Sequence, residues 1–432
     1  MFGRSFAFVL SACLCAALFA GCSGGGSSGT NAAGIPAAGH PANAAAPHGA
    51  VRRTANVPVC SGTNPTAFMG TSANVADATY AVTVGGFGNQ VCDDYGSIVG
   101  GQFNAISTDN DSAYESFIGN GQNNVITGHN AHYSAIVGGL NNTLQFGQYS
   151  FIGGGTGNTL TGDSAVLAGG STNKVSAEYG FVGAGTNNVV SGEGGYVAAG
   201  GYNTASGLGA VVDGGFNSTA GGTFATIPGG YENSAAGTYS FAAGARASAA
   251  QNGTFVWSDG SDGDATLTST RAYEFLARAS GGVTFWTNAA STVGATLAPG
   301  SGTWASASDR NLKTDVVRVD DAAVLDKVSA LPISRWSYKS EHGVRHVGPM
   351  AQDFYAAFGV GEDDKHITSI DEDGVALAAI KALHARVGAL GAENAALRSQ
   401  LAALKTSQAQ HDLLVDRRLQ RLTVAVAGSR RR

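Results

Sequence analysis

The segments "IGGGTGN" (152–158), "AGGSTN" (168–173) and "VGAGTNN" (182–188) are three successive copies of one short repeat. The repeat runs through residues 81–250, and the first glycines of successive copies lie 14 to 19 residues apart. A short, sustained period of this kind predicts a solenoid. Each copy reads as a short apolar strand, a glycine turn, an asparagine and a second short strand. Such a unit buries a face only when copies stack, so the core exists only as a stack.

The turn residues of the repeat have a physical role. Glycine accepts positive φ and asparagine tolerates the left-handed region, so we expect both to form the turns. Two other readings of the repeat are a calcium-binding roll and a disordered chain. A calcium-binding nonapeptide roll requires a nine-residue period with a regular aspartate, which this repeat lacks. A disordered glycine-rich chain would not place Val, Ile, Phe or Tyr before each glycine. The expected fold class is therefore mainly β.

The register of serine, alanine, glycine and asparagine in these copies resembles the head repeats of trimeric autotransporter adhesins. That resemblance implies a left-handed parallel β-roll solenoid over residues 59–250, formed in a homotrimer. A ligand on a host surface, or a glycan, is the partner expected of such a head.

Composition limits the remaining function classes. Only 13% of the 432 residues are charged and the net charge is −6, so nucleic acid is not an expected partner. Residues 1–22 read as a signal peptide, because the apolar run "FAFVLSACLCAALFA" (6–20) is too short for a typical spanning helix. It ends in "AGC", which resembles the lipobox of bacterial lipoproteins and implies lipidation at Cys22. An ordinary secretory signal followed by a nearby cysteine is the alternative.

The resemblance to lipoproteins predicts a location in the bacterial cell envelope, lipid-anchored at the outer membrane or cell surface. Residues 23–58 are rich in Gly, Ser, Ala and Pro and read as a flexible linker after the anchor. Cys60 and Cys92 are the cysteines that remain in the mature chain, and export favours a disulfide between them over two free thiols.

Residues 251–305 change character and read as a β-rich neck. Apolar and polar residues alternate around turns there, which predicts a few antiparallel strands. The acidic run "DGSDGD" (259–264) raises the question of a metal site. Its spacing does not match a calcium-binding helix-loop-helix, so an exposed turn is expected, with no metal and no cofactor.

The C-terminal third carries four motifs in sequence: "SDRNLK" (308–313), "WSYK" (336–339), "RHVGPMAQDF" (345–354) and "DGVALAAIKAL" (373–383). They resemble the intramolecular chaperone auto-processing domain that ends many phage tail spikes, endosialidases and bacterial fibre-like proteins. The resemblance implies a small α+β domain, placed here at residues 306–378. It also implies that the domain assembles a trimer and is then cut off by the chain itself.

A serine hydroxyl becomes a nucleophile when a neighbouring base takes its proton, and a lysine serves as that base when its amine is neutral. The resemblance assigns Ser308 as nucleophile and Lys313 as base. It predicts an autoproteolytic serine peptidase that acts once, in cis, at a bond beside Ser308, taken as Ser308–Asp309. Positions i and i+5 do not face each other on a regular helix, so the backbone must bend here, or the lysine must come from another subunit. His346 is either a supporting residue or a core or interface histidine.

Residues 379–427 show a heptad pattern that predicts a coiled coil. Branched residues and Asn at position a with Leu at d favour two strands, whereas the family resemblance implies three. "QAQHD" (408–412) interrupts the phase before a second apolar set. The first set is Ile380, Leu383, Val387, Leu390, Asn394, Leu397, Leu401 and Leu404, and the second is Val415, Leu419, Leu422 and Val426.

Two functions follow from these parts. The first is a self-processing, trimeric, adhesin-like surface lipoprotein. The second is a prophage-derived tail-fibre or tail-spike protein that binds or degrades a surface polysaccharide. A glycosidase requires paired carboxylates flanking a groove, and residues 81–250 contain few acids with no obvious pair.

Overall fold

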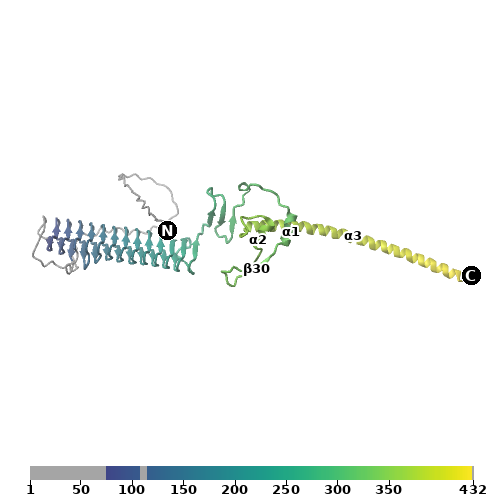
Figure 1. Cartoon of the computed structure of the whole chain (residues 1–432), viewed down its shortest axis with the longest axis horizontal. Coiled ribbons are helices and arrows are strands. Elements are labelled where there is room, and N and C mark those ends of the chain that lie inside the picture. The colour runs from purple at the N-terminus through teal and green to yellow at the C-terminus, as the bar shows by residue number, and fades with distance from the viewer. Residues whose placement is uncertain (1–73, 108–113, 431–432) are drawn as a thin grey trace, which may run out of the picture. The chain divides into compact units, whose positions relative to one another are not determined.

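The computed structural model describes residues 74–107 and 114–430. The chain divides into two compact units, Met1–Arg278 and Ala279–Arg432. The first unit contains a stack of short strands, and the second contains small sheets and a long helix (Figure 1). Cys22 and Cys60 lie outside the described residues, as do the predicted signal peptide and linker.

The first unit is a parallel β-solenoid, which confirms the prediction from the repeat (Figure 1). Each coil gives one short strand to each of two 13-stranded sheets. The first sheet consists of β1 (Val75–Ala76), β3 (Gln90–Val91), β5 (Ala105–Ser107), β7 (Val125–Thr127), β9 (Thr143–Gln145), β11 (Thr159–Leu160), β13 (Lys174–Val175), β15 (Val189–Val190), β17 (Thr204–Ala205), β19 (Thr219–Ala220), β21 (Ser234–Ala235), β23 (Ala247–Ala249) and β25 (Leu267–Thr268). The second sheet consists of β2 (Val82–Thr83), β4 (Ser97–Ile98), β6 (Phe117–Ile118), β8 (Ala135–Ile136), β10 (Phe151–Ile152), β12 (Val166–Leu167), β14 (Phe181–Val182), β16 (Tyr196–Val197), β18 (Val211–Val212), β20 (Thr226–Ile227), β22 (Phe241–Ala245), β24 (Phe255–Asp259) and β26 (Phe275–Arg278).

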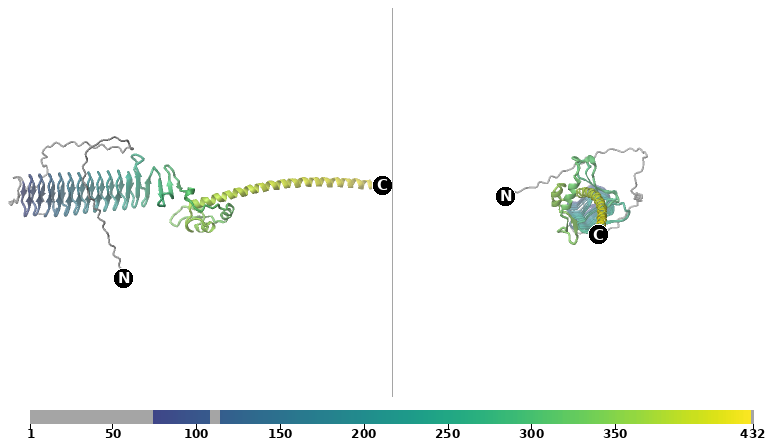
Figure 2. Two further views of the ribbon diagram at one scale, coloured as in Figure 1. Left: turned by 90° about the horizontal axis from the view of Figure 1, so that it is seen from above. Right: turned by 90° about the vertical axis from the view of Figure 1, so that its right-hand side faces the viewer.

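The core of the solenoid is a double column of inward side chains. Ile136 and Ile152 of the second sheet and Leu144 and Leu160 of the first sheet are fully buried, one coil above the next. Each strand contributes about one large inward residue, so a single coil has almost nothing to bury by itself. Stacking supplies the hydrophobic burial that holds the coils together, and the coils are evenly stacked in Figure 2.

A ladder of buried asparagines runs along one corner of the solenoid. Nδ2 of Asn173 donates to the carbonyls of Gly169 and, in the next coil, Gly185, while Oδ1 accepts from the backbone N–H of Asn188. These bonds satisfy polar groups that would otherwise be buried at a cost. Ser218 takes the ladder position in one coil. The other members are Asn89, Asn104, Asn124, Asn142, Asn158, Asn203 and Asn233.

The ladder corrects the expected role of asparagine. The left-handed residue is the one before the ladder position, and it is Thr172, Asn187 or Tyr202 in different coils. Asn187 therefore has the left-handed backbone expected of asparagine. The ladder asparagines instead make hydrogen bonds inside the turn. Glycine is required elsewhere in the turn. Gly170 has φ of +93°, and a Cβ there would lie 2.2 Å from the carbonyl oxygen of Gly185.

The solenoid extends to Arg278, past the boundary predicted at residue 250. Strands β24 and β26 pair in parallel with the coils before them, so the prediction of antiparallel strands is wrong for this part. The stacked rings of Phe241, Phe255 and Phe275 continue the coil-to-coil packing into these last strands. Residues 251–278 lack the Gly-Gly turn and following Asn of the earlier copies, so the repeat could not be followed into them from the sequence.

The second unit begins with an antiparallel sheet, as expected for the neck. It contains β27 (Val283–Trp286), β28 (Gly294–Leu297) and β29 (Trp304–Ser306). A 3-10 helix η1 (Arg310–Leu312) and helix α1 (Asp321–Ala330) follow, then the hairpin of β30 (Ser334–Trp336) and β31 (His346–Gly348), helix α2 (Ala351–Phe358) and helix α3 (Ser369–Ser429).

Helix α3 is 61 residues long and contains both predicted heptad segments without a break at 408–412. Helix α1 packs on α3, and Lys381 is paired with Asp321. The apolar heptad residues remain exposed in the single chain, as at Leu390 and Leu397. An apolar seam of this kind is the surface that coiled coils bury between helices.

Candidate functional site

The candidate site is built on the turn that follows β29. The Oδ1 atom of Asp309 accepts hydrogen bonds from the backbone N–H of Asn311 at 2.9 Å and from its Nδ2 at 3.1 Å. Asp309 is therefore the N-cap of η1, and the short helix ends at Lys313, where the backbone is extended again. The sequence "SDRNL" thus folds as one tight turn between extended residues.

This turn brings Ser308 and Lys313 together. The Nζ atom of Lys313 donates to Oγ of Ser308 at 2.7 Å. A regular α-helix would separate positions five apart, but a single 3-10 turn flanked by extended residues folds the chain back on itself. The bend expected from the sequence is present, and the two side chains meet within one chain.

The arrangement has the parts of a serine nucleophile with an amine base. Both side chains are exposed in the single chain. Burial favours the neutral form of an amine. The single chain therefore has the contact between the two side chains but does not bury the Lys313 amine. Among the described residues, no carboxylate is within ion-pair distance of the Lys313 amine, and Asn311 holds the Asp309 carboxylate.

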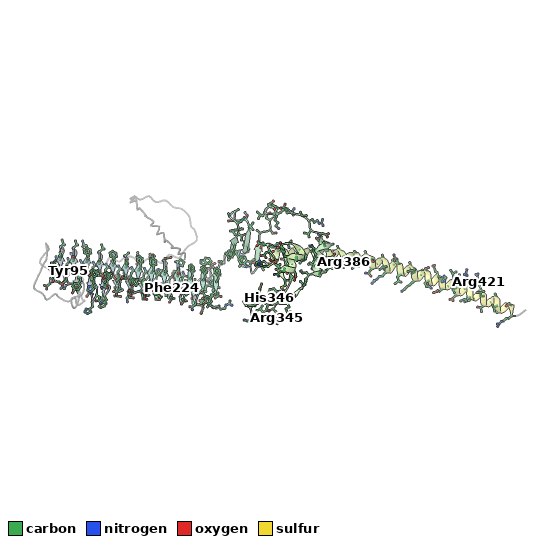
Figure 3. The ribbon with its side chains drawn as sticks, viewed as in Figure 1. Tyr95, Phe224, Arg345, His346, Arg386 and Arg421 are labelled. Carbon is green, nitrogen blue, oxygen red and sulfur yellow. The ribbon has the colours of Figure 1, made fainter. Side chains whose placement is uncertain are left out.

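His346 lies in a separate cluster on the β30–β31 hairpin (labelled in Figure 3). Its ring stacks on Trp336 with centroids 4.6 Å apart, and its Nε2 lies 2.9 Å from Oε2 of Glu341. Among the described residues, no hydrogen bond or ring contact joins His346 to Ser308 or Lys313. These contacts fit the reading of His346 as a packing residue of the domain.

The unit that carries the site has a small hydrophobic core. In its described part, Val324, Phe354 and Ala379 are the buried hydrophobic residues. A cavity of about 410 Å³ lies among α1, the end of α2 and the start of α3. Large apolar residues lie on the surface instead, including Val317 at 81% exposure and Val347 at 69%. A monomeric domain rarely leaves this much apolar surface uncovered.

The remaining predicted sites have mixed outcomes. Cys92 is disulfide-bonded, while its predicted partner Cys60 lies outside the described residues, so the pairing stays a prediction.

In the acidic run 259–264, Asp262 pairs with Arg278 and Asp264 pairs with Arg246. The structure explains that run as an ion-paired loop. Within the described ranges, no group of three His, Cys, Asp or Glu residues is placed to hold a metal.

One column of acids in the solenoid was missed from the sequence. Asp163, Glu178 and Glu193 occupy equivalent positions in successive coils. A hydrogen bond to Glu178 and the charges of all three carboxylates raise the pKa of Tyr179. The three acids lie 15 residues apart, which is the length of one coil, so their spacing in the sequence could have predicted the column. All three are exposed, so the column lacks the groove that a glycosidase requires.

Comparison with known proteins identifies one part of the chain. Residues 308–359 match the Peptidase_S74 family model, described as the chaperone of endosialidase. No curated protein matches the chain. The match begins at Ser308 itself and ends at Gly359, the C-cap of α2, so it contains η1, α1, the β30–β31 hairpin and α2. The family predicted from the sequence motifs is thereby confirmed for this segment: residues 308–359 match the chaperone of endosialidase.

Proposed function

We propose that this chain is one subunit of a self-processing trimeric fibre. Its C-terminal unit gathers three chains, and Ser308 and Lys313 then cut that unit from the solenoid. The 2.7 Å contact between Nζ of Lys313 and Oγ of Ser308 is the observation that carries the proposal. It places an amine on the hydroxyl at the first residue of the matched domain.

The chaperone role is supported by what the C-terminal unit leaves uncovered. Its described hydrophobic core is confined to Val324, Phe354 and Ala379, while the three-stranded sheet exposes Phe285, Trp286 and Trp304. Copies of the same chain would cover these surfaces. Gathering the C-terminal units first raises the local concentration of the solenoids, which are slow to fold because their edges are open until they stack.

Helix α3 provides the means of gathering. Its exposed heptad seam fits a parallel coiled coil, and we propose three strands because the matched domain belongs to tail-fibre-like assemblies. By length and composition alone, α3 is also long and apolar enough to cross a membrane. The ion pair of Lys381 with Asp321, and that of Arg386 with Asp326, tie its N-terminal part to α1 and favour a coiled coil in water.

The proposed reaction is a serine-mediated peptide cleavage. Lys313 takes the proton of the Ser308 hydroxyl, whose oxygen attacks a neighbouring peptide carbonyl carbon. The C–N bond breaks, the amide nitrogen receives the proton from the lysine, and an ester remains. Water then hydrolyses the ester, which restores the hydroxyl and leaves a new carboxylate and a new amine. No cofactor takes part.

Ring geometry decides which bond reacts in cis. Attack by Oγ of Ser308 on the carbonyl of Ala307 closes a five-membered ring and breaks Ala307–Ser308. Attack on the carbonyl of Ser308 itself closes a strained four-membered ring. We therefore propose the bond on the N-terminal side of Ser308, in place of the Ser308–Asp309 bond taken from the sequence. The two products differ by one serine, which an intact-mass measurement resolves.

Assembly supplies the trigger in this proposal. Lys313 is exposed in the single chain, and packing of three C-terminal units around it would exclude water and favour the neutral amine. Cleavage after assembly removes the assembling unit. The fibre then has no route back through the path by which it folded, so it is kinetically trapped.

The test is a Ser308→Ala variant of the full-length protein, compared with wild type on a denaturing gel before and after boiling. The proposal expects shortened chains from wild type and intact chains from the variant, both trimeric before boiling. A Ser340→Ala variant is the matched control, because it removes another exposed serine hydroxyl of the same unit, outside the four motifs, and should leave cleavage unchanged. A shortened chain from the Ser308→Ala variant would rule out the dyad.

We also propose that the fibre is anchored through a lipid on Cys22 at the bacterial surface, where the solenoid contacts a surface ligand or glycan. The lipobox-like sequence supports this location. The mass of the mature N-terminal peptide tests it: a diacylglycerol or acylated cysteine at its first position is expected. An unmodified N-terminus at another residue would contradict the anchor and leave the self-processing proposal standing.

A further inference from the structure

The two sheets of the solenoid present outward faces of different chemistry. In five successive coils, the outward residues of the second sheet are Phe151, Val166, Phe181, Tyr196 and Val211. We call the outward side of this sheet the apolar face. Its residues are half-buried or exposed in the single chain, and the rings of Phe181 and Tyr196 stack 5.0 Å apart.

The neighbouring outward row of the apolar face is made of small residues. The positions two residues further along the same five strands are Gly153, Ala168, Gly183, Ala198 and Asp213. Asp213 is the one charged residue among these ten positions. Small side chains beside aromatic and branched ones leave room for another surface to approach closely.

The first sheet presents a polar face in the same coils. Its outward residues there are Thr159, Lys174, Val189, Thr204 and Thr219. Two residues further along lie Thr161, Ser176, Ser191, Ser206 and Gly221. Both sheets have the same backbone and the same inward packing, so the fold does not require this difference. In these coils the polar face carries several Thr and Ser hydroxyls and a lysine, whereas the apolar face carries one hydroxyl, that of Tyr196, and one carboxylate, that of Asp213.

An aromatic ridge borders the apolar face, two residues upstream of its strands. Tyr95 and Phe224, labelled in Figure 3, have φ of 59° and 54° and are about half exposed. Bulky residues adopt this left-handed conformation at a cost that glycine avoids. The equivalent position in the remaining coils is held by Gly194, Gly209, Gly253, Ser164 and Glu115. Within the chain these rings stack from coil to coil, as at Tyr133 and Tyr149, whose centroids lie 5.2 Å apart. The other ridge members are Tyr80, Tyr133, Tyr149, Tyr179, Tyr239 and Tyr273.

We infer that the apolar face, edged by the aromatic ridge, is where the solenoids of three copies of this chain pack on one another, leaving the polar face toward solvent. The inference rests on the proposed trimer and names the face of the solenoid that the trimer buries.

The choice of a second copy as occupant follows from helix α3. A parallel coiled coil of α3 brings identical solenoids together pointing the same way, and cyclic symmetry turns the same face of every copy toward the common axis. The two outward rows of the apolar face carry one charged residue in five coils, so they offer an unrelated partner little to recognise. The acids Asp163, Glu178 and Glu193 lie outside these rows, three residues before the strands. An identical face matches the apolar face in length and in coil spacing.

The test uses two cysteine variants of the full-length protein, Val211→Cys in β18 and Thr204→Cys in β17. Both positions belong to one coil and both are half-buried in the single chain, so they are matched. Each variant is treated with N-ethylmaleimide, modification is assigned by peptide mass spectrometry, and light scattering gives the number of chains. In a trimer, the thiol at position 211 should react at least about tenfold more slowly than the thiol at 204, because an interface core excludes water.

Equal rates in a trimeric protein, or slower reaction at 204, would overturn the choice of face and leave the trimer intact. Light scattering that shows single chains would overturn the trimer itself. A second pair guards against a local effect: Val166→Arg should lower the thermal midpoint of the assembled protein. Thr204→Arg, whose partners in register are the uncharged Val189 and Thr219, should leave it unchanged. Equal midpoints for the two arginine variants would also contradict the inference.

Discussion

Lys313 reaches back across a single 3-10 turn to place its Nζ 2.7 Å from Oγ of Ser308. The reach depends on the backbone, because the two residues are five apart and would point away from each other on an α-helix. The proposed nucleophile and base are therefore held together by a local turn within one chain. Both side chains are exposed in the single chain. In the proposed mechanism, assembly of three chains buries the Lys313 amine.

The cap of this turn can be tested separately from the dyad. Replacing Asp309 by Ala removes the acceptor that holds the N–H of Asn311. Loss of one N-cap is equivalent to ~1 kcal/mol, so we expect cleavage to slow roughly fivefold. Asp309→Asn retains a side-chain oxygen and should cut at nearly the wild-type rate. The measurement is a time course of shortened chain on a denaturing gel, and equal rates for all three proteins would show that the cap does not position Lys313.

Two adjacent glycines provide a matched test of the solenoid turn. Gly170→Ala places a Cβ 2.2 Å from the carbonyl oxygen of Gly185 in a left-handed backbone, and we expect a loss of about 2 kcal/mol or more in unfolding free energy. Gly169→Ala meets no atom within 4 Å and should be nearly neutral. Thermal unfolding of the two variants compares them directly. Equal midpoints would contradict the turn geometry.

The acidic loop 259–264 should depend on one arginine. Arg246 pairs with Glu232 and Asp264 at 2.9 Å each, and its guanidinium lies over the ring of Tyr231. Arg246→Met removes these contacts, so limited proteolysis should cut the loop several times faster. Arg271→Met is the control, since Arg271 is 83% exposed in its side chain. Added calcium should protect neither variant, and protection by calcium would revive a metal site.

The heptad seam of α3 should decide assembly. Leu390→Glu puts a charge at a d position, and the number of chains measured by light scattering should fall to one at micromolar concentration. Ala392→Glu adds the same charge two residues away, on the side of the helix opposite the seam, and should leave assembly unchanged. A trimeric Leu390→Glu variant would show that the coiled coil is not the assembling element.

Much of this fold is readable from the sequence because its causes are local. Glycine at the turn and one large apolar residue per strand predict a solenoid. The motifs around Ser308 and Lys313 predict the C-terminal chaperone domain. The ladder role of Asn173 was not readable, since its partners lie in the coils before and after it. The strands ending at Arg278 were missed because residues 251–278 lack the Gly-Gly turn and following Asn that mark the earlier coils. The contrast between the two outward faces emerges only when the register assigns each residue to a side.

The timing of cleavage tests the central claim most directly. Newly made wild-type chains, pulse-labelled and separated by native size, would be sampled over time and each fraction run on a denaturing gel. The account predicts intact chains in the monomer fraction and chains shortened at residue 308 only in the trimer fraction. Shortened chains that appear first as monomers would contradict it.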